Sequence, residues 1–228
     1  MVLKGILVDF GDTLVHVDEE ANKRYEKALL SIVRKYECRI NLNDLTSALW
    51  YCYGNSTKGE VKSLREFWGL FLKKMEVSEH PALVKDLEKA RSNHIAALFK
   101  LHDGVFSTLS ILQMKYKLAL VSNCSIGLEE TLTALGLTSF FNCIILSYKV
   151  GARKPERRIY VEALECLRLG ASECIFVADE ISDLEGARAV GLKTILIRQG
   201  SHTFDETKDP DFKPDFECNH ISEITEFI

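Results

Sequence analysis

Short apolar runs rich in β-branched residues recur along the chain, and polar residues bound each of them. The runs are KGILVDF (4–10), KLALVSN (117–123), NCIILSY (142–148), ECIFVAD (173–179) and KTILIRQ (193–199). Strands that are buried on both faces of a sheet have this pattern. Helix-like stretches, such as 155–168 and 183–190, separate the later runs. We therefore predict an α/β fold built on a doubly wound parallel sheet with helices on both sides.

The regular alternation stops between residues 16 and 100, where the chain is charged and apolar residues recur at three- and four-residue steps. Two examples are EEANKRYEKALLSIVRKY (19–36) and SLREFWGLFLKKM (63–75). This spacing predicts helices that are inserted directly after the first strand. We expect residues 1–15 and 101–228 to form the α/β core and residues 16–100 to form a helical domain.

Two aromatic groups, LWYCY (49–53) and FWGLF (67–71), lie in the expected helical domain. Such groups can line a pocket, but at helical spacing they more often pack the interior of a helix bundle, which is our expectation here. The segment TFDETKDPDFKPDFE (203–217) has the composition of a loop, because Pro, Asp and Lys crowd together in it. A short strand and a helix are expected to close the chain after it.

Composition and charge indicate a globular protein and argue against partners such as nucleic acid or a membrane. The 228-residue chain is 46% hydrophobic with a formal net charge of −4, as in an ordinary globular protein. Its basic residues are scattered, which argues against nucleic acid as a partner. No apolar run approaches the roughly 20 residues that span a bilayer, so we expect no membrane partner. We expect a cytoplasmic monomer or homodimer.

The cysteines and histidines are spread along the chain. The seven cysteines form no C-x-x-C pair, and they show no Cys/His spacing typical of a metal site. They are Cys38, Cys52, Cys124, Cys143, Cys166, Cys174 and Cys218. We expect reduced, mostly buried thiols. The six histidines are equally dispersed, so no zinc site is predicted.

Polar residues follow the predicted strands at the points where they end. They are Asp9, Gly11, Asp12 and Thr13 after the first strand, Ser122 and Asn123 after the second, Lys154 beyond the third, and Asp179, Glu180 and Asp183 after the fourth. In an open α/β sheet, ligands bind beyond the carboxyl ends of the strands. We expect these side chains to meet at one edge of the sheet.

This set of side chains suits the handling of phosphate. A carboxylate at a strand end can attack phosphorus and form an aspartyl-phosphate. Several carboxylates and a phosphate need compensating positive charge, which Mg²⁺ supplies through oxygen ligands. Lys154 adds an ammonium group, and Ser122 and Thr13 add hydroxyl donors.

Four segments together resemble the four motifs of the haloacid dehalogenase-like hydrolase superfamily. They are DFGDTL (9–14), VSNCS (121–125), GARKPERRIY (151–160) and VADEISDLEGARAVG (177–191), in the order that the superfamily has. The resemblance spans about residues 2–198. It implies a Rossmann-like core, and it implies that the helical insertion is a cap over the active site, as in the subfamily whose cap follows the first motif.

The resemblance also implies a role for each matching residue. Asp9 would be the nucleophile and a metal ligand, and the backbone carbonyl of Gly11 and the side chain of Asp179 would bind Mg²⁺ directly. Asp183 would hold a metal-bound water or act as a further ligand. Thr13, Ser122 and Asn123 would bind the phosphoryl group, with Asn123 acting through its backbone N–H. Lys154 would steady both Asp9 and the phosphate. The expected partner is a small phosphorylated metabolite.

One position departs from the superfamily pattern. Its phosphatases usually carry a second aspartate two residues after the nucleophile, where it acts as general acid and base. Here that place is Gly11, and the carboxyl group stands at Asp12. Losing such a group typically costs about 10²–10⁴ in rate.

Three interpretations follow from this departure. Asp12 can take over proton transfer, aided by the flexibility of the glycine before it, and the protein is then a phosphatase. Asp12 can instead only stabilise the turn, which leaves a weak phosphatase or a phosphate-binding relative. In the third interpretation the protein is a dehalogenase, because the dehalogenases of the superfamily also lack the second acid. They attack carbon rather than phosphorus and need no metal.

The acids of the fourth motif favour a phosphatase over a dehalogenase. Asp179, Glu180 and Asp183 would repel one another without a cation, and the dehalogenases tend not to keep the metal-binding acid. We therefore expect a Mg²⁺-dependent phosphatase that acts on a small phosphomonoester. The helical cap should move about hinges near His16 and His102.

Overall fold

A six-stranded parallel sheet forms the core of the computed structural model, which describes residues 2–199 and 211–228. Its strands are β1 (Gly5–Val8), β4 (Lys117–Ser122), β5 (Cys143–Leu146), β6 (Cys174–Ala178), β7 (Lys193–Ile197) and β8 (Phe216–Cys218). Their order is β5-β4-β1-β6-β7-β8, and all neighbours are parallel. The predicted strands are confirmed, and β1 lies between β4 and β6, so their polar ends are adjacent.

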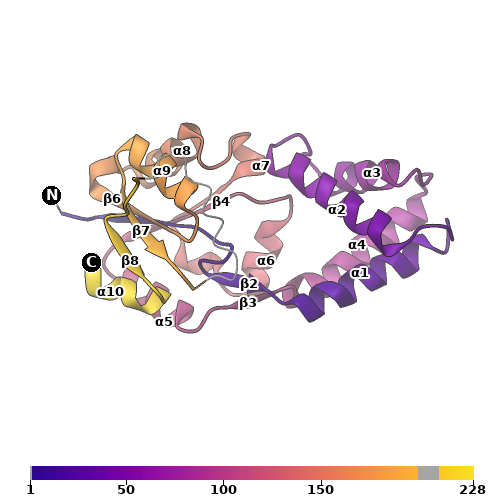
Figure 1. Ribbon diagram of the computed structural model, residues 1–228, viewed down its shortest axis with the longest axis horizontal. Coiled ribbons are helices and arrows are strands. Elements are labelled where there is room, and N and C mark those ends of the chain that lie inside the picture. The colour runs from indigo at the N-terminus through magenta and orange to yellow at the C-terminus, as the bar shows by residue number, and fades with distance from the viewer. Residues whose placement is uncertain (1, 200–210) are drawn as a thin grey trace.

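Helices cover both faces of this sheet, as predicted (Figure 1). Neighbouring side chains of β1 point to opposite faces: Ile6 and Val8 belong to one buried cluster, and Leu7 belongs to another. The first cluster includes residues of α5 (Val105–Gln113), α6 (Leu128–Ala134) and α10 (Ile224–Phe227). The second includes residues of α8 (Arg157–Leu167) and α9 (Ile181–Val190). The fold is therefore the doubly wound α/β arrangement.

Four helices form the predicted insertion within the described residues. They are α1 (Glu19–Val33), α2 (Leu42–Thr57), α3 (Leu64–Lys74) and α4 (Pro81–His94). Each begins at a residue whose side chain accepts a backbone hydrogen bond, as expected for an N-cap: Asp18, Asn41, Ser63 and His80. The insertion has its own hydrophobic cluster, separate from the two beside the sheet.

The aromatic groups of the insertion mostly pack its interior. Phe67, Trp68 and Phe71 are buried, and Trp68 contacts each of the two phenylalanines edge to face. Their packing confirms the predicted core role of this group. In the other group, Trp50 and Tyr51 are instead exposed, at 74% and 45%.

The insertion leaves and rejoins the core through two short paired strands. β2 (Val15–Val17) pairs antiparallel with β3 (Phe99–Leu101), so that Val15 lies opposite Leu101. The strands were not expected from the sequence, because three residues are too few for a readable alternation. In Figure 1 they run between the sheet and the helices of the insertion. The exact limits of the two domains stay a prediction.

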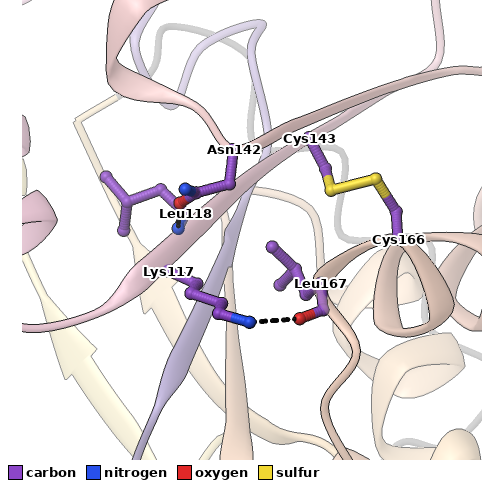
Figure 2. Close-up of a disulfide and its surroundings, with 6 residues drawn as sticks. All are labelled: Lys117, Leu118, Asn142, Cys143, Cys166 and Leu167. Carbon is purple, nitrogen blue, oxygen red and sulfur yellow. Dashed lines mark hydrogen bonds between the residues drawn. A yellow bond between two sulfur atoms is a disulfide. The ribbon is translucent and has the colours of Figure 1, made fainter.

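The expectation that all cysteines are reduced is wrong for one pair. Cys143, at the start of β5, forms a disulfide with Cys166, near the end of α8 (Figure 2). Helix α8 packs on the sheet beside β5, which brings the two Cα atoms to 6.2 Å. The same corner is held by Lys117, whose Nζ donates to the carbonyl of Leu167 at 2.9 Å. Free thiols remain at Cys38, Cys52, Cys124, Cys174 and Cys218, and all of them except Cys38 are buried.

The C-terminal part of the chain ends as predicted, with β8 followed by α10. Most of the predicted loop 203–217 falls at residues 200–210, outside the described residues. None of the helices in the described part of the chain has the length and apolar character needed to cross a membrane.

Candidate active site

Asp9 follows directly on β1 and is nearly buried, with 7% of its surface exposed. Its backbone N–H donates to the carbonyl of Val177 in β6 at 2.9 Å. This bond extends the ladder between the two strands by one residue beyond Val8. The Asp9 side chain is thereby fixed at the carboxyl edge of the sheet, where β1 meets β6.

Lys154 connects the first and fourth predicted motifs. Its Nζ lies 2.5 Å from Oδ1 of Asp9 and 2.6 Å from Oδ2 of Asp183. The lysine is 2% exposed and Asp183 is also 2% exposed, so this is a buried ion pair with two carboxylates. The structure therefore brings together three of the residues that were selected from the sequence.

Asn123 holds Lys154 in place through two hydrogen bonds to its backbone. The Lys154 N–H donates to Oδ1 of Asn123 at 2.7 Å, and Nδ2 of Asn123 donates to the Lys154 carbonyl at 3.0 Å. The next residue packs on α9, because a Cβ at Gly186 would lie 2.6 Å from the carbonyl oxygen of Pro155. The segment that carries Lys154 is thus fixed by β4 on one side and by α9 on the other.

Asp179 and Thr13 form a second connection between the motifs. The buried Thr13 hydroxyl donates to Oδ1 of Asp179 at 3.1 Å. Asp179 follows β6 directly and is 7% exposed. In this arrangement the Thr13 hydroxyl orients the acid. Its predicted contact with phosphate stays a prediction.

Burial and neighbouring charges shift the pKa values of the acidic and basic groups at this site. Burial raises the pKa of Asp9 and of Asp183, although Lys154 opposes both shifts. Burial, together with the charge of Asp9, raises the pKa of Asp179 to about 8. Burial also raises the pKa of Glu180. Burial by itself would lower the pKa of Lys154, but Asp183 and Asp9 raise it, so the ammonium is retained.

This donor set suits a hard divalent cation. Asp9 and Asp183 share the ammonium of Lys154, and Asp179 is a further buried acid whose pKa the charge of Asp9 raises, so an added positive charge would stabilise the ionised forms of all three. Among the described residues no three His, Cys, Asp or Glu side chains converge as a ready-made metal site. Mg²⁺ needs only one or two protein carboxylates, because it keeps several waters. The residues present therefore fit such an ion.

Ser122 and Gly11 lie at the same edge as Asp9. Ser122 is the last residue of β4, next to β1, and it is 3% exposed. The Gly11 carbonyl, a predicted metal ligand, accepts from the backbone N–H of Thr13 at 2.5 Å. A Cβ at Gly11 would meet no heavy atom within 4 Å, so a side chain would fit there.

Asp12 occupies an unusual backbone conformation. Its φ is 50°, in the left-handed region that aspartate tolerates better than most residues. Its carboxylate acts electrostatically on His102, whose pKa is lowered by burial and by His16 and raised in part by Asp12. The two imidazole rings are 5.0 Å apart between their centroids. Asp12 therefore lies beside the paired crossings of the insertion.

Three supporting contacts at the site were missed from the sequence. Tyr160 donates its hydroxyl to the carbonyl of Asp183 at 2.7 Å. Gln199 Nε2 donates to the carbonyl of Thr13 at 2.6 Å. The third is the side-chain role of Asn123, for which only the backbone N–H was considered. Tyr160 is the last residue of the third motif, and this place in a motif was the one signal in the sequence that could have identified any of the three contacts.

Comparison with known proteins identifies the family of this chain. The family model for haloacid dehalogenase-like hydrolases matches residues 42–197. A glyceraldehyde 3-phosphate phosphatase of Methanopyrus kandleri is 26% identical, over 100% of this chain and 97% of the relative.

Two solved structures share the fold over 99% of this chain and 97% of their own chains. A HAD phosphatase from Thermococcus onnurineus is 20% identical with a TM-score of 0.70. A 2-haloacid dehalogenase from Pseudomonas syringae is 18% identical with a TM-score of 0.72. Both activities thus occur on this fold, and the choice between them depends on the site. With its matching family model, parallel core and inserted helices, the chain belongs to the haloacid dehalogenase-like hydrolase family.

Proposed function

We propose that the chain is a Mg²⁺-dependent phosphatase that hydrolyses a small phosphomonoester through an aspartyl-phosphate on Asp9. The observation that carries the proposal is the buried ion-pair arrangement of Lys154 with Asp9 and Asp183. It leaves an excess of buried carboxylates that a divalent cation would neutralise, and the positive charge of that cation and of Lys154 would then favour binding of a phosphoryl group. The full-length similarity to a glyceraldehyde 3-phosphate phosphatase supports a substrate of that size.

The chain's own residues divide the reaction among them. A carboxylate oxygen of Asp9 attacks phosphorus, and the bond from phosphorus to the ester oxygen breaks. Water then attacks the phosphorus of the aspartyl-phosphate, which releases phosphate and restores the Asp9 carboxylate. Lys154 holds Asp9 in position and offers positive charge to the phosphoryl oxygens, and Ser122 and Asn123 bind the same group.

Asp9, Asp179 and the carbonyl of Gly11 are the groups that would hold Mg²⁺ directly, and Asp183 would hold a metal-bound water or act as a further ligand. When bound, the ion supplies charge stabilisation for the phosphoryl oxygens. We assign proton transfer to Asp12, which is the carboxyl group nearest in sequence to the missing second acid: it gives a proton to the leaving ester oxygen in the first step and takes one from the attacking water in the second. The backbone of Asp12 is left-handed directly after Gly11, so the direction of the chain changes at this turn.

A dehalogenase is the second candidate, because Gly11 stands where phosphatases carry an acid and a 2-haloacid dehalogenase shares the fold. The test compares glyceraldehyde 3-phosphate and other phosphomonoesters, with Mg²⁺ and with EDTA, against 2-chloropropionate in EDTA. Phosphate release that requires Mg²⁺ supports the proposal. Halide release in EDTA without phosphatase activity would establish the dehalogenase.

The same assays on Asp9→Asn test the nucleophile. An amide cannot form the acyl phosphate, so turnover should be lost. The matched control is Asp86→Asn in α4, which should retain full turnover. A protein that binds inorganic phosphate but turns over no ester would be the phosphate-binding relative.

A further inference from the structure

The loop that joins β4 to α6 is held by two different parts of the molecule. It runs from Asn123 to Gly127, directly after Ser122. Its first half bonds to the core: Asn123 contacts Lys154, and the Cys124 N–H donates to Oγ of Ser147 at 3.1 Å.

The second half of the loop bonds to the helical insertion. The Ile126 N–H donates to Oγ of Ser56 in α2 at 2.9 Å. Nη2 of Arg91 in α4 donates to the Gly127 carbonyl at 3.1 Å, and Nη1 lies 2.5 Å from Oε2 of Glu130. In Figure 1, α6 lies on the side of the core that faces the insertion.

Both insertion side chains are buried at this contact. Ser56 is 0% exposed and Arg91 is 9% exposed. A buried guanidinium needs its hydrogen bonds, and the loop supplies one of them. If the insertion moved away, the Ile126 N–H and the Gly127 carbonyl would both lose their partners.

The absence of a side chain at Gly127 makes room for Arg91 at this contact. Its φ is +93°, and a Cβ would lie 2.0 Å from Nη2 of Arg91. A second close approach of the same two parts occurs where a Cβ at Gly59 would lie 3.1 Å from Cα of Gly151. Two glycines thus allow the insertion to reach the core backbone at separate points.

We propose that Ser56 and Arg91 are positioning residues that order the Asn123–Gly127 loop, and through it Ser122 and Asn123, when the insertion contacts the core. The inference rests on the proposed binding of phosphate by Ser122 and Asn123. Contact between insertion and core then determines how tightly the phosphoryl group is held. Neither residue needs to touch the substrate.

The test uses the full chain with Ser56→Ala and Arg91→Lys. Lysine keeps the charge but cannot bond Gly127 and Glu130 with one planar fork. The matched controls are Ser47→Ala in α2 and Arg24→Lys in α1, two exposed residues of the insertion. We measure amide hydrogen exchange of the loop in the free protein, inhibition by inorganic phosphate with Mg²⁺, and kcat and KM.

Both test variants should exchange the Ile126 amide about 10-fold faster or more, and the inhibition constant for phosphate should rise by a similar factor. The controls should match the wild type. A purely structural role would lower the midpoint of unfolding without changing phosphate inhibition of the folded protein, and that result would overturn the proposal.

The outcomes separate the two proposals. If the wild type hydrolyses phosphomonoesters and binds phosphate while both test variants behave as the controls do, only the positioning role is wrong. If the wild type neither hydrolyses an ester nor binds phosphate, the proposed function itself is wrong, and the positioning role falls with it.

Discussion

The Asn123 side chain bonds to both backbone polar groups of Lys154, one as acceptor at 2.7 Å and one as donor at 3.0 Å. Replacing it with alanine should leave these two groups without their partner and allow Lys154 to shift. A displacement of about 1 Å at a reacting group can cost about 10² in rate. We therefore expect Asn123→Ala to lower kcat/KM by about 10-fold or more.

The control for this variant is Asn142→Ala. The Asn142 side chain also accepts a backbone hydrogen bond at 2.8 Å, from Leu118 near the far end of β4 (Figure 2). Both variants should lose stability, each by about 1–3 kcal/mol for a buried group left unpaired. Only Asn123→Ala should lose activity, and equal kinetics in the two variants would contradict the assigned role.

Removing Lys154 should destabilise the protein strongly. Lys154→Met leaves Asp9 and Asp183 buried without their shared ammonium, which typically costs about 3–5 kcal/mol. Urea unfolding in EDTA measures the free energy of unfolding. The comparison is Lys149→Met, which breaks a partly exposed pair with Glu129 and should cost about 1 kcal/mol or less. Similar losses in the two variants would show that the Lys154 pairs contribute little.

The role of Asp12 can be tested by moving its carboxyl group. Asp12→Asn should lower kcat by about 10²–10⁴ with little change in substrate binding if Asp12 transfers the proton. If Asp12 only shapes the turn, kcat should stay within a few-fold. The double variant Gly11→Asp with Asp12→Gly is structurally reasonable, because a Cβ at position 11 meets no atom and glycine tolerates a φ of 50°. A large gain in rate would show that the native order lacks an effective acid.

Stability without metal should fall as the pH rises. The pKa of Asp179 is raised from 3.8 to about 8 in the folded protein, so the folded state binds this proton more tightly than the unfolded state. The resulting stabilisation is complete below about pH 4 and is lost as the pH rises through about 8. In EDTA the free energy of unfolding should therefore decline between these limits, with a slope of at most about 1.4 kcal/mol per pH unit from this group.

Asp179→Asn is the control for the pH dependence, because an amide does not titrate. The free energy of unfolding of this variant should decline less steeply with pH than that of the wild type. Saturating Mg²⁺ should make the wild-type free energy of unfolding less dependent on pH, because the ion favours the ionised acids. A stability that rises from pH 5 to pH 8 in EDTA would contradict the raised pKa.

The disulfide between Cys143 and Cys166 should contribute to stability. It closes a loop with a sequence separation of 23 residues, for which about 2–4 kcal/mol is typical. Cys166→Ser should lose this amount in urea unfolding without reductant, whereas Cys38→Ser, at an exposed free thiol, should lose little. Peptide mapping of the wild type should recover the linked pair, and finding both thiols alkylated instead would contradict it.

Five strands of the sheet, β1, β4, β5, β6 and β7, could be predicted from the sequence because each reads as a continuous apolar run. The order of the motifs then placed Asp9 and Asp183 at one edge. Contacts between distant residues could not be predicted, because no local pattern encodes them: Thr13 bonds Asp179 across 166 residues, and Asn123 bonds Lys154 across 31. The disulfide was missed for the same reason.

The pairing of β2 with β3 places the two ends of the helical insertion side by side, at Val15 and Leu101. The α/β core therefore keeps its connectivity whichever helices are inserted between β2 and β3. The insertion has a hydrophobic interior of its own. In evolutionary terms, a helical unit of different length or surface can be exchanged at this junction without altering the order of the strands in the sheet, so the insertion is free to diverge while the strand ends that carry Asp9 and Asp179 are retained.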